Sequence, residues 1–231
     1  MVPARVVELG SAVLHWLCFQ ALCGRSPLLS EHYLSQPIGE FLLHHHSGDL
    51  NSERDHPNLN QAGRRGRPRQ IDFCLSSRDT NRITAAFELK WVSEGAFDKQ
   101  RIVDDLLRLE ALRIPEQQHV YRYFLVAGKE QHFEENFQNS QANLGDGGGR
   151  VQFFPEFLNF NADDDLTVVT TTIGVPQRAA CDEFARYYQS PLPRRFVTSR
   201  VVGQTMNGFT VYVWRVRSAK RRTTLPLPHD G

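Results

Sequence analysis

The stretch RQIDFCLSSRDTNRITAAFELKW, residues 69–91, contains two runs in which apolar and polar residues alternate. A period of two predicts β-strands, here over residues 70–76 and 83–91. The joining segment SRDTN, residues 77–81, has the composition of a turn. The stretch therefore predicts a β-hairpin, and its strands carry three charged residues, Asp72, Glu88 and Lys90.

These charged residues suggest a catalytic centre. Residues two apart on a strand share a face, so Glu88 and Lys90 are neighbours. If the two strands pair antiparallel, Asp72 joins them, and a hard divalent cation would relieve the repulsion between the two carboxylates. Mg²⁺ at such a corner would polarise a phosphoryl oxygen and activate water, with the ammonium beside it. The alternative is a solvated edge strand with ordinary cross-strand charge pairs, but the apolar neighbours of Glu88 favour a central strand.

The same residues resemble the signature of the PD-(D/E)-x-K, or restriction-endonuclease-like, nuclease superfamily. Ile71-Asp72 is followed by fifteen residues, by Glu88-Leu89-Lys90 and by the helical pattern KQRIVDDLLRL at 99–109, with Ile71 where the family name has proline. The resemblance covers residues 28–128. It implies an α/β fold with an αβββαβ core, in which a mixed central sheet is flanked by helices, here with a C-terminal β-hairpin extension.

The resemblance also implies roles for individual residues. Asp72, Glu88 and Lys90 would be catalytic, and Asp72, Glu88 and Leu89 would bind Mg²⁺, with Mn²⁺ as a substitute. The family often adds a glutamate from the first core helix, for which Glu31 or Glu40 is available. It also adds a Lys or Gln from the helix after the motif, here Lys99 or Gln100.

Local basic clusters bear on nucleic-acid binding, because the net charge of +1 provides no overall basic field. The segment GRRGRPR at 63–69 could contact phosphates through its arginines, and it could equally be a disordered loop. Residues 191–222 contain eight Lys or Arg and no acid, and Arg200, Arg215 and Arg217 alternate there with apolar residues. The residues expected to bind nucleic acid are Arg64, Arg65, Arg67, Arg69 and Lys99.

The composition, 231 residues with 40% hydrophobic and 23% charged, fits one globular domain. We expect this domain at 1–217, with its core at about 28–128 and an extension at 129–217, before a flexible tail at 218–231. Further helices are expected at 4–23, 30–46, 131–137 and 176–188, further strands at 119–128 and 166–175, and a hairpin around Asn207-Gly208. Residues 47–67 are expected to form an exposed loop and 140–150 a flexible Gly-rich connector.

Other residues are expected to be structural. The four cysteines have no zinc-ligand spacing, which indicates reduced thiols and a cytoplasmic protein. The apolar N-terminal run is too short to span a membrane. His44, His45, His46 and His56 match no metal-ligand pattern, and Arg108 and Glu110 are expected to serve packing and surface charge pairing.

We therefore expect a Mg²⁺-dependent hydrolase, an endonuclease or phosphodiesterase acting on DNA, with RNA also compatible. A homodimer or a partner protein would suit a chain without a separate recognition domain. The alternative is a non-catalytic module that binds nucleic acid or protein and retains the nuclease fold. A hydrolase acting on another phosphoester is a third possibility.

Overall fold

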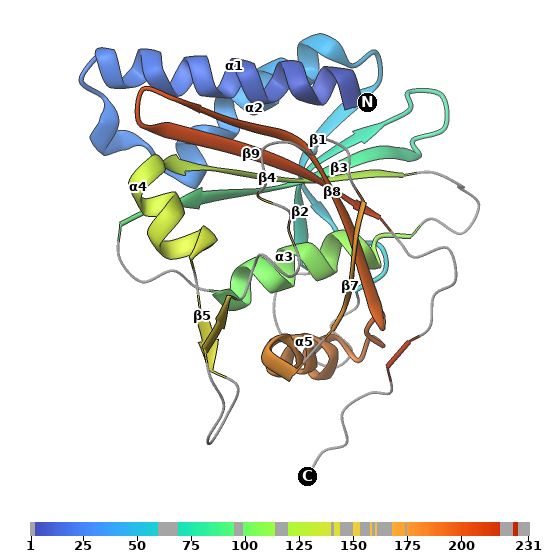
Figure 1. Cartoon of the computed structure of the whole chain (residues 1–231). Coiled ribbons are helices and arrows are strands. Elements are labelled where there is room, and N and C mark those ends of the chain that lie inside the picture. Colours follow the sequence, from blue (N-terminus) through green and yellow to red (C-terminus); the bar gives the residue numbers. More distant parts are fainter. Residues whose placement is uncertain are drawn as a thin grey trace.

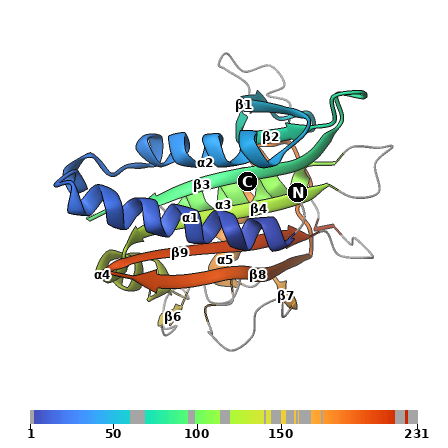
Figure 2. The same ribbon diagram turned by 90° about the horizontal axis from the view of Figure 1, so that it is seen from above.

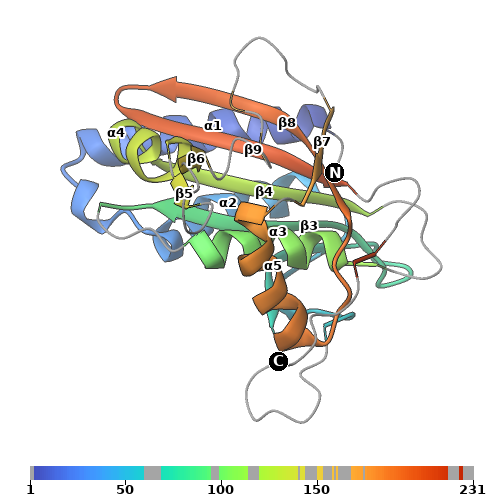
Figure 3. The ribbon, with the colours of Figure 1, turned by 60° about the horizontal axis from the view of Figure 1, so that its bottom comes forward.

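The computed structural model describes residues 3–59, 69–94, 99–113, 120–139, 141–143, 150–152, 158, 160, 168–173, 175–217 and 224–225. Its centre is a mixed seven-stranded sheet with the order β1-β2-β3-β4-β9-β8-β7. Helices α1 (Pro3–Leu22) and α2 (Glu31–His45) cover one face, side by side in Figure 2. Helices α3 (Lys99–Ala111) and α5 (Val175–Tyr188) lie on the other face (Figure 1 and Figure 3). The protein is thus an α/β fold with helices on both faces of a mixed sheet.

The first half of the sheet is a meander followed by a crossover. Strands β1 (Asp49–Asp55), β2 (Gln70–Ser76) and β3 (Ile83–Val92) pair antiparallel in sequence order. The chain then passes through α3 and returns as β4 (Tyr121–Lys129), which pairs parallel with β3. The order of elements from α2 to β4 is therefore α, β, β, β, α, β.

The second half continues the same sheet. The short α4 (Glu130–His132) runs into a π-helical segment, Phe133–Gln138. Strand β7 (Val168–Thr172) pairs with β8 (Arg195–Met206), and the hairpin partner of β8, β9 (Phe209–Arg217), pairs antiparallel with β4. The expected turn of this hairpin is confirmed, since Asn207 and Gly208 have φ values of 50° and 76°.

The helices follow from local sequence. Helix α1 ends before Gly24, whose φ of 71° is a typical helix-terminating conformation. Helix α2 begins after Ser30, whose Oγ accepts a hydrogen bond from the backbone N–H of Tyr33 at 3.2 Å. Pro37 lies inside α2 without dividing it. None of the described helices combines the length and apolar character needed to cross a membrane.

Two expectations about irregular segments were wrong. Residues 49–55 belong to the expected loop 47–67 but form edge strand β1, whose polar sequence DLNSERD shows no apolar alternation because most of it is exposed or half-buried. The ends of the Gly-rich connector pair as β5 (Gln141–Asn143) and β6 (Arg150–Gln152). Of the expected tail at 218–231 the structure describes two residues: Thr224 forms a β-bridge with Pro193, and the Leu225 N–H donates to Leu192 O at 2.9 Å.

Each face of the sheet has its own hydrophobic core. On β3, Ala85, Phe87 and Leu89 belong to the core under α1 and α2, whereas Ala86 and Val92 belong to the core that includes α3. Because side chains alternate along a strand, Glu88 and Lys90 lie on the α3 face with Ala86 and Val92. This alternation places the charged residues of β3 opposite α3.

Candidate active site

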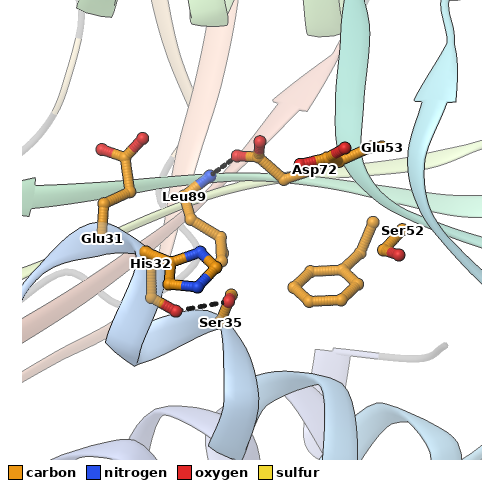
Figure 4. Close-up of a pocket in the computed structure, with 8 residues that line it drawn as sticks. Glu31, His32, Ser35, Ser52, Glu53, Asp72 and Leu89 are labelled. Carbon is orange, nitrogen blue, oxygen red and sulfur yellow. Dashed lines mark hydrogen bonds between the residues drawn. The ribbon is translucent and has the colours of Figure 1, made fainter.

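The site lies where the pairing of β2 with β3 stops. The last paired residues are Phe73 and Phe87, so Asp72 and Glu88 occupy the next opposed positions. The Leu89 N–H donates to Asp72 Oδ2 at 2.7 Å instead of to a backbone partner (Figure 4). The N–H and C=O of one strand residue point the same way, so the Leu89 carbonyl also faces β2. The hairpin thus brings Asp72, Leu89 and Glu88 to one place, as expected.

Asp72 is in an environment that opposes its charge. Burial raises its pKa from 3.8 to about 6, the hydrogen bond from Leu89 lowers it, and the carboxylates of Asp105 and Glu31 raise it further. Arg108 also lowers the pKa of Asp72, so burial is the main cause of its raised value. A cation at this position would restore the ionised form.

Glu88 is fully buried and paired with an arginine from α3. Arg108 Nε lies 3.0 Å from Glu88 Oε1, and Arg108 Nη2 lies 3.0 Å from Oε2 and 2.5 Å from Asp105 Oδ1. Burial raises the pKa of Glu88, Arg108 lowers it, and Asp72 and Asp105 raise it. The expectation that Arg108 serves packing and surface charge pairing was wrong, because the residue is buried and its guanidinium binds both oxygens of Glu88.

Lys90 connects the two helical layers. Its Nζ lies 3.1 Å from Glu31 Oε2 on α2 and 3.1 Å from Asp105 Oδ2 on α3. Burial lowers the pKa of Lys90, but Asp105 and Glu31 raise it by more, so the net shift is upward. Lys90 is therefore a protonated ammonium, suited to orienting water or stabilising negative charge rather than to accepting a proton.

Glu31 is the glutamate of the first core helix that reaches the site. It stands at the start of α2, and its Oε2 also accepts a hydrogen bond from the Trp91 N–H at 3.4 Å. Glu40 instead accepts from Gln36 on the exposed side of α2, at 3.1 Å. The sequence left open whether Glu31 or Glu40 contributes to the site, and the structure places Glu31 there.

Of the remaining expected residues, the structure describes the side chains of Gln100 and Arg69. Gln100 donates to Asp104 Oδ1 at 2.8 Å, within α3. Arg69 is held by α5, with its Nε 2.7 Å from the Tyr188 hydroxyl. Arg64, Arg65 and Arg67 fall outside the described residues, as does the side chain of Lys99.

The arginines of the C-terminal hairpin do not form one exposed surface. Arg200 is 2% exposed and donates to the backbone oxygen of Phe160 at 3.1 Å, so it is part of the core. Arg215 is half-buried, and its guanidinium lies 4.6 Å from the ring centre of Tyr121. Of Arg200, Arg215 and Arg217, only the half-buried Arg215 and Arg217 are accessible to a ligand.

A pocket of about 320 Å³ opens beside Asp72 between α2 and β1 (Figure 4). Glu53 on β1 lies opposite Asp72 in register, between the paired residues Ser52 and Arg54, and has a left-handed backbone with φ 51°. The sequence carried no signal for Glu53, because it stands in a polar segment without alternation. The pocket is lined by Glu31, His32, Ser35, Ser52, Glu53, Asp72, Phe73 and Leu89.

The charges of the site leave room for a divalent cation. With all groups ionised, four carboxylates face two cations and leave a net charge of −2 on Glu31, Asp72, Glu88, Asp105, Lys90 and Arg108. Mg²⁺ is commonly bound through one or two carboxylates plus water and substrate oxygens. Asp72, the Leu89 carbonyl and Glu88 provide hard oxygen ligands of this kind. Across the part of the chain that the structure describes, no group of three or more His, Cys, Asp or Glu residues is arranged to hold a metal ion by itself.

Comparisons with protein-family models, with curated proteins and with solved structures found no match to this chain.

Proposed function

We propose that the protein is a divalent-metal-dependent hydrolase of phosphodiester bonds in DNA, of the restriction-endonuclease-like type. The observation that carries the proposal is that Asp72 and Glu88 lie opposite each other where the β2–β3 pairing ends, with Lys90 held next to them by Glu31 and Asp105. The order α2-β1-β2-β3-α3-β4, with β4 parallel to β3, supports it, because it is the order that the resemblance implies.

Asp72, Glu88 and the Leu89 carbonyl would hold Mg²⁺ or Mn²⁺, which when bound polarises phosphoryl oxygens and lowers the pKa of bound water. Lys90 orients the attacking water and stabilises negative charge that develops on the phosphoryl group. Glu31 and Asp105 fix the Lys90 ammonium from opposite sides, each at 3.1 Å. The pocket between α2 and β1 would admit the substrate next to these groups.

A cleavage assay tests this proposal. Supercoiled plasmid, linear single-stranded DNA and RNA are incubated with wild type, Lys90→Ala and Lys129→Ala in Mg²⁺, Mn²⁺ or EDTA. Lys129 is an exposed lysine at the end of β4 and is the matched control. We expect metal-dependent cleavage by wild type and Lys129→Ala and its loss in Lys90→Ala. Cleavage that survives in Lys90→Ala, or that persists in EDTA, would contradict the proposal.

One observation favours a second candidate, a non-catalytic nucleic-acid-binding module. Both oxygens of Glu88 are already neutralised by Arg108, so the fold does not need a metal at that carboxylate. Such a module would bind DNA in a salt-dependent manner with no response to Mg²⁺ or Mn²⁺ and no cleavage.

A further inference from the structure

The guanidinium of Arg108 occupies the side of Glu88 that faces α3. It makes a two-point fork with the carboxylate and a third contact with Asp105. A guanidinium stays charged at every physiological pH, and its planar donors match a carboxylate in two places. Glu88 therefore has a permanent cationic partner whether or not a metal is present.

The backbone of Arg108 is also held in place. Its backbone oxygen accepts a hydrogen bond from His56 Nε2 at 2.9 Å, while His56 Nδ1 accepts from the Asn58 N–H at 3.1 Å. Its neighbours on α3, Leu107 and Leu109, are buried in the core. The segment of α3 that carries Arg108 is thus hydrogen-bonded through its backbone and packed in the core, with the guanidinium on both oxygens of Glu88.

We propose that Arg108 is the resident cation of this centre: it positions Glu88 when no metal is bound and competes with a divalent cation for that carboxylate. This inference rests on the proposed function and adds a regulator of metal affinity to it. Each carboxylate oxygen has two acceptor positions, so the fork leaves part of Glu88 available to a metal. Arg108 weakens metal binding by its charge and by occupying these oxygens.

The inference predicts an effect of unusual sign. Removing Arg108 changes the net charge of the cluster from −2 to −3, which should strengthen the attraction for a divalent cation. If Arg108 only held the structure together, its removal would misplace Glu88 and weaken metal binding. The direction of the change therefore separates competition from a structural role.

The experiment is an isothermal titration of Mn²⁺ into wild type, Arg108→Met, Arg108→Lys and Arg113→Met. Arg113 follows α3 and pairs with Glu110 at 3.0 Å, outside the cluster, so it is the matched control. We expect Arg108→Met to bind Mn²⁺ at least about tenfold more tightly than wild type. Arg113→Met should match wild type. Equal or weaker binding by Arg108→Met would overturn the inference.

Arg108→Lys covers the case in which the methionine variant does not fold. Lysine keeps the charge but lacks the fork, so we expect tighter Mn²⁺ binding than wild type by a smaller factor, and unchanged or weaker binding overturns the inference. If wild type binds and cleaves while the arginine variants gain no affinity, only the role of Arg108 fails. If neither wild type nor any variant binds Mn²⁺, both this role and the proposed metal-dependent function fail.

Discussion

Replacing Asp72 by asparagine should stabilise the protein and at the same time remove a ligand for the metal. Asparagine keeps an oxygen acceptor for the Leu89 N–H, which lies 2.7 Å from Asp72 Oδ2. It removes a charge that is buried near Asp105 and Glu31. The substitution therefore changes the electrostatics of the site and preserves its main hydrogen bond.

The size of the effect follows from the pKa of Asp72, which burial raises from 3.8 to about 6. Between these values the folded state binds more protons than the unfolded state, so stability falls as pH rises through this window and stays low above it. At about 1.4 kcal/mol per pKa unit, the ionised carboxylate destabilises the fold by about 3 kcal/mol above pH 6. The asparagine side chain is neutral at every pH, so Asp72→Asn should gain about this amount at pH 8 and almost nothing below about pH 4.

Urea denaturation followed by circular dichroism, in EDTA at pH 4 and pH 8, measures this difference. Asp79→Asn is the control, because Asp79 is exposed in the turn between β2 and β3. If Asp72→Asn is no more stable than wild type at pH 8, the electrostatic reasoning is refuted. Adding Mg²⁺ should then stabilise wild type but not Asp72→Asn, since a ligand of the folded state shifts unfolding by mass action.

Three further predictions concern neighbouring residues. Glu53→Gly should raise the free energy of unfolding by about 1 kcal/mol, since glycine accepts the φ of 51°. Glu53→Ala keeps the strained backbone, so an equal gain in Glu53→Ala would show that backbone strain is not the cause. Burial lowers the pKa of His56 from 6.5 to about 4, so wild type should lose up to about 3 kcal/mol as pH falls through this window. In urea titrations, the free energy of unfolding of His56→Asn should depend less on pH than that of wild type. The same pH dependence in both proteins would exclude His56 as the cause of the loss of stability at low pH. Glu31→Gln should slow plasmid cleavage at least about tenfold, because Lys90 loses an ion-pair partner. Glu40→Gln should cleave like wild type. Equal cleavage rates for Glu31→Gln and Glu40→Gln would contradict a role of Glu31 in the site.

The hairpin of β2 and β3 could be predicted because its information is local. Alternation over a few residues determines which side chains share a face, and the turn sets the pairing of the two strands. The opposed positions of Asp72 and Glu88 follow from this local pattern. The N-cap at Ser30 and the Asn207-Gly208 turn depend in the same way on a few adjacent residues.

Only the tertiary structure decided which residues surround this hairpin. Arg108 and Asp105 reach the site because α3 crosses over β3, and one turn of an amphipathic helix gives no indication that its charged residues will be buried against a strand. Glu53 arrives on a polar edge strand that is held by backbone pairing with β2, so its side chains carry no periodic signal. The sequence alone determined which charged residues stand on the hairpin, because that depends on strand period. The charge balance around them depends on contacts between distant segments, and these arise only when the helices pack on the sheet.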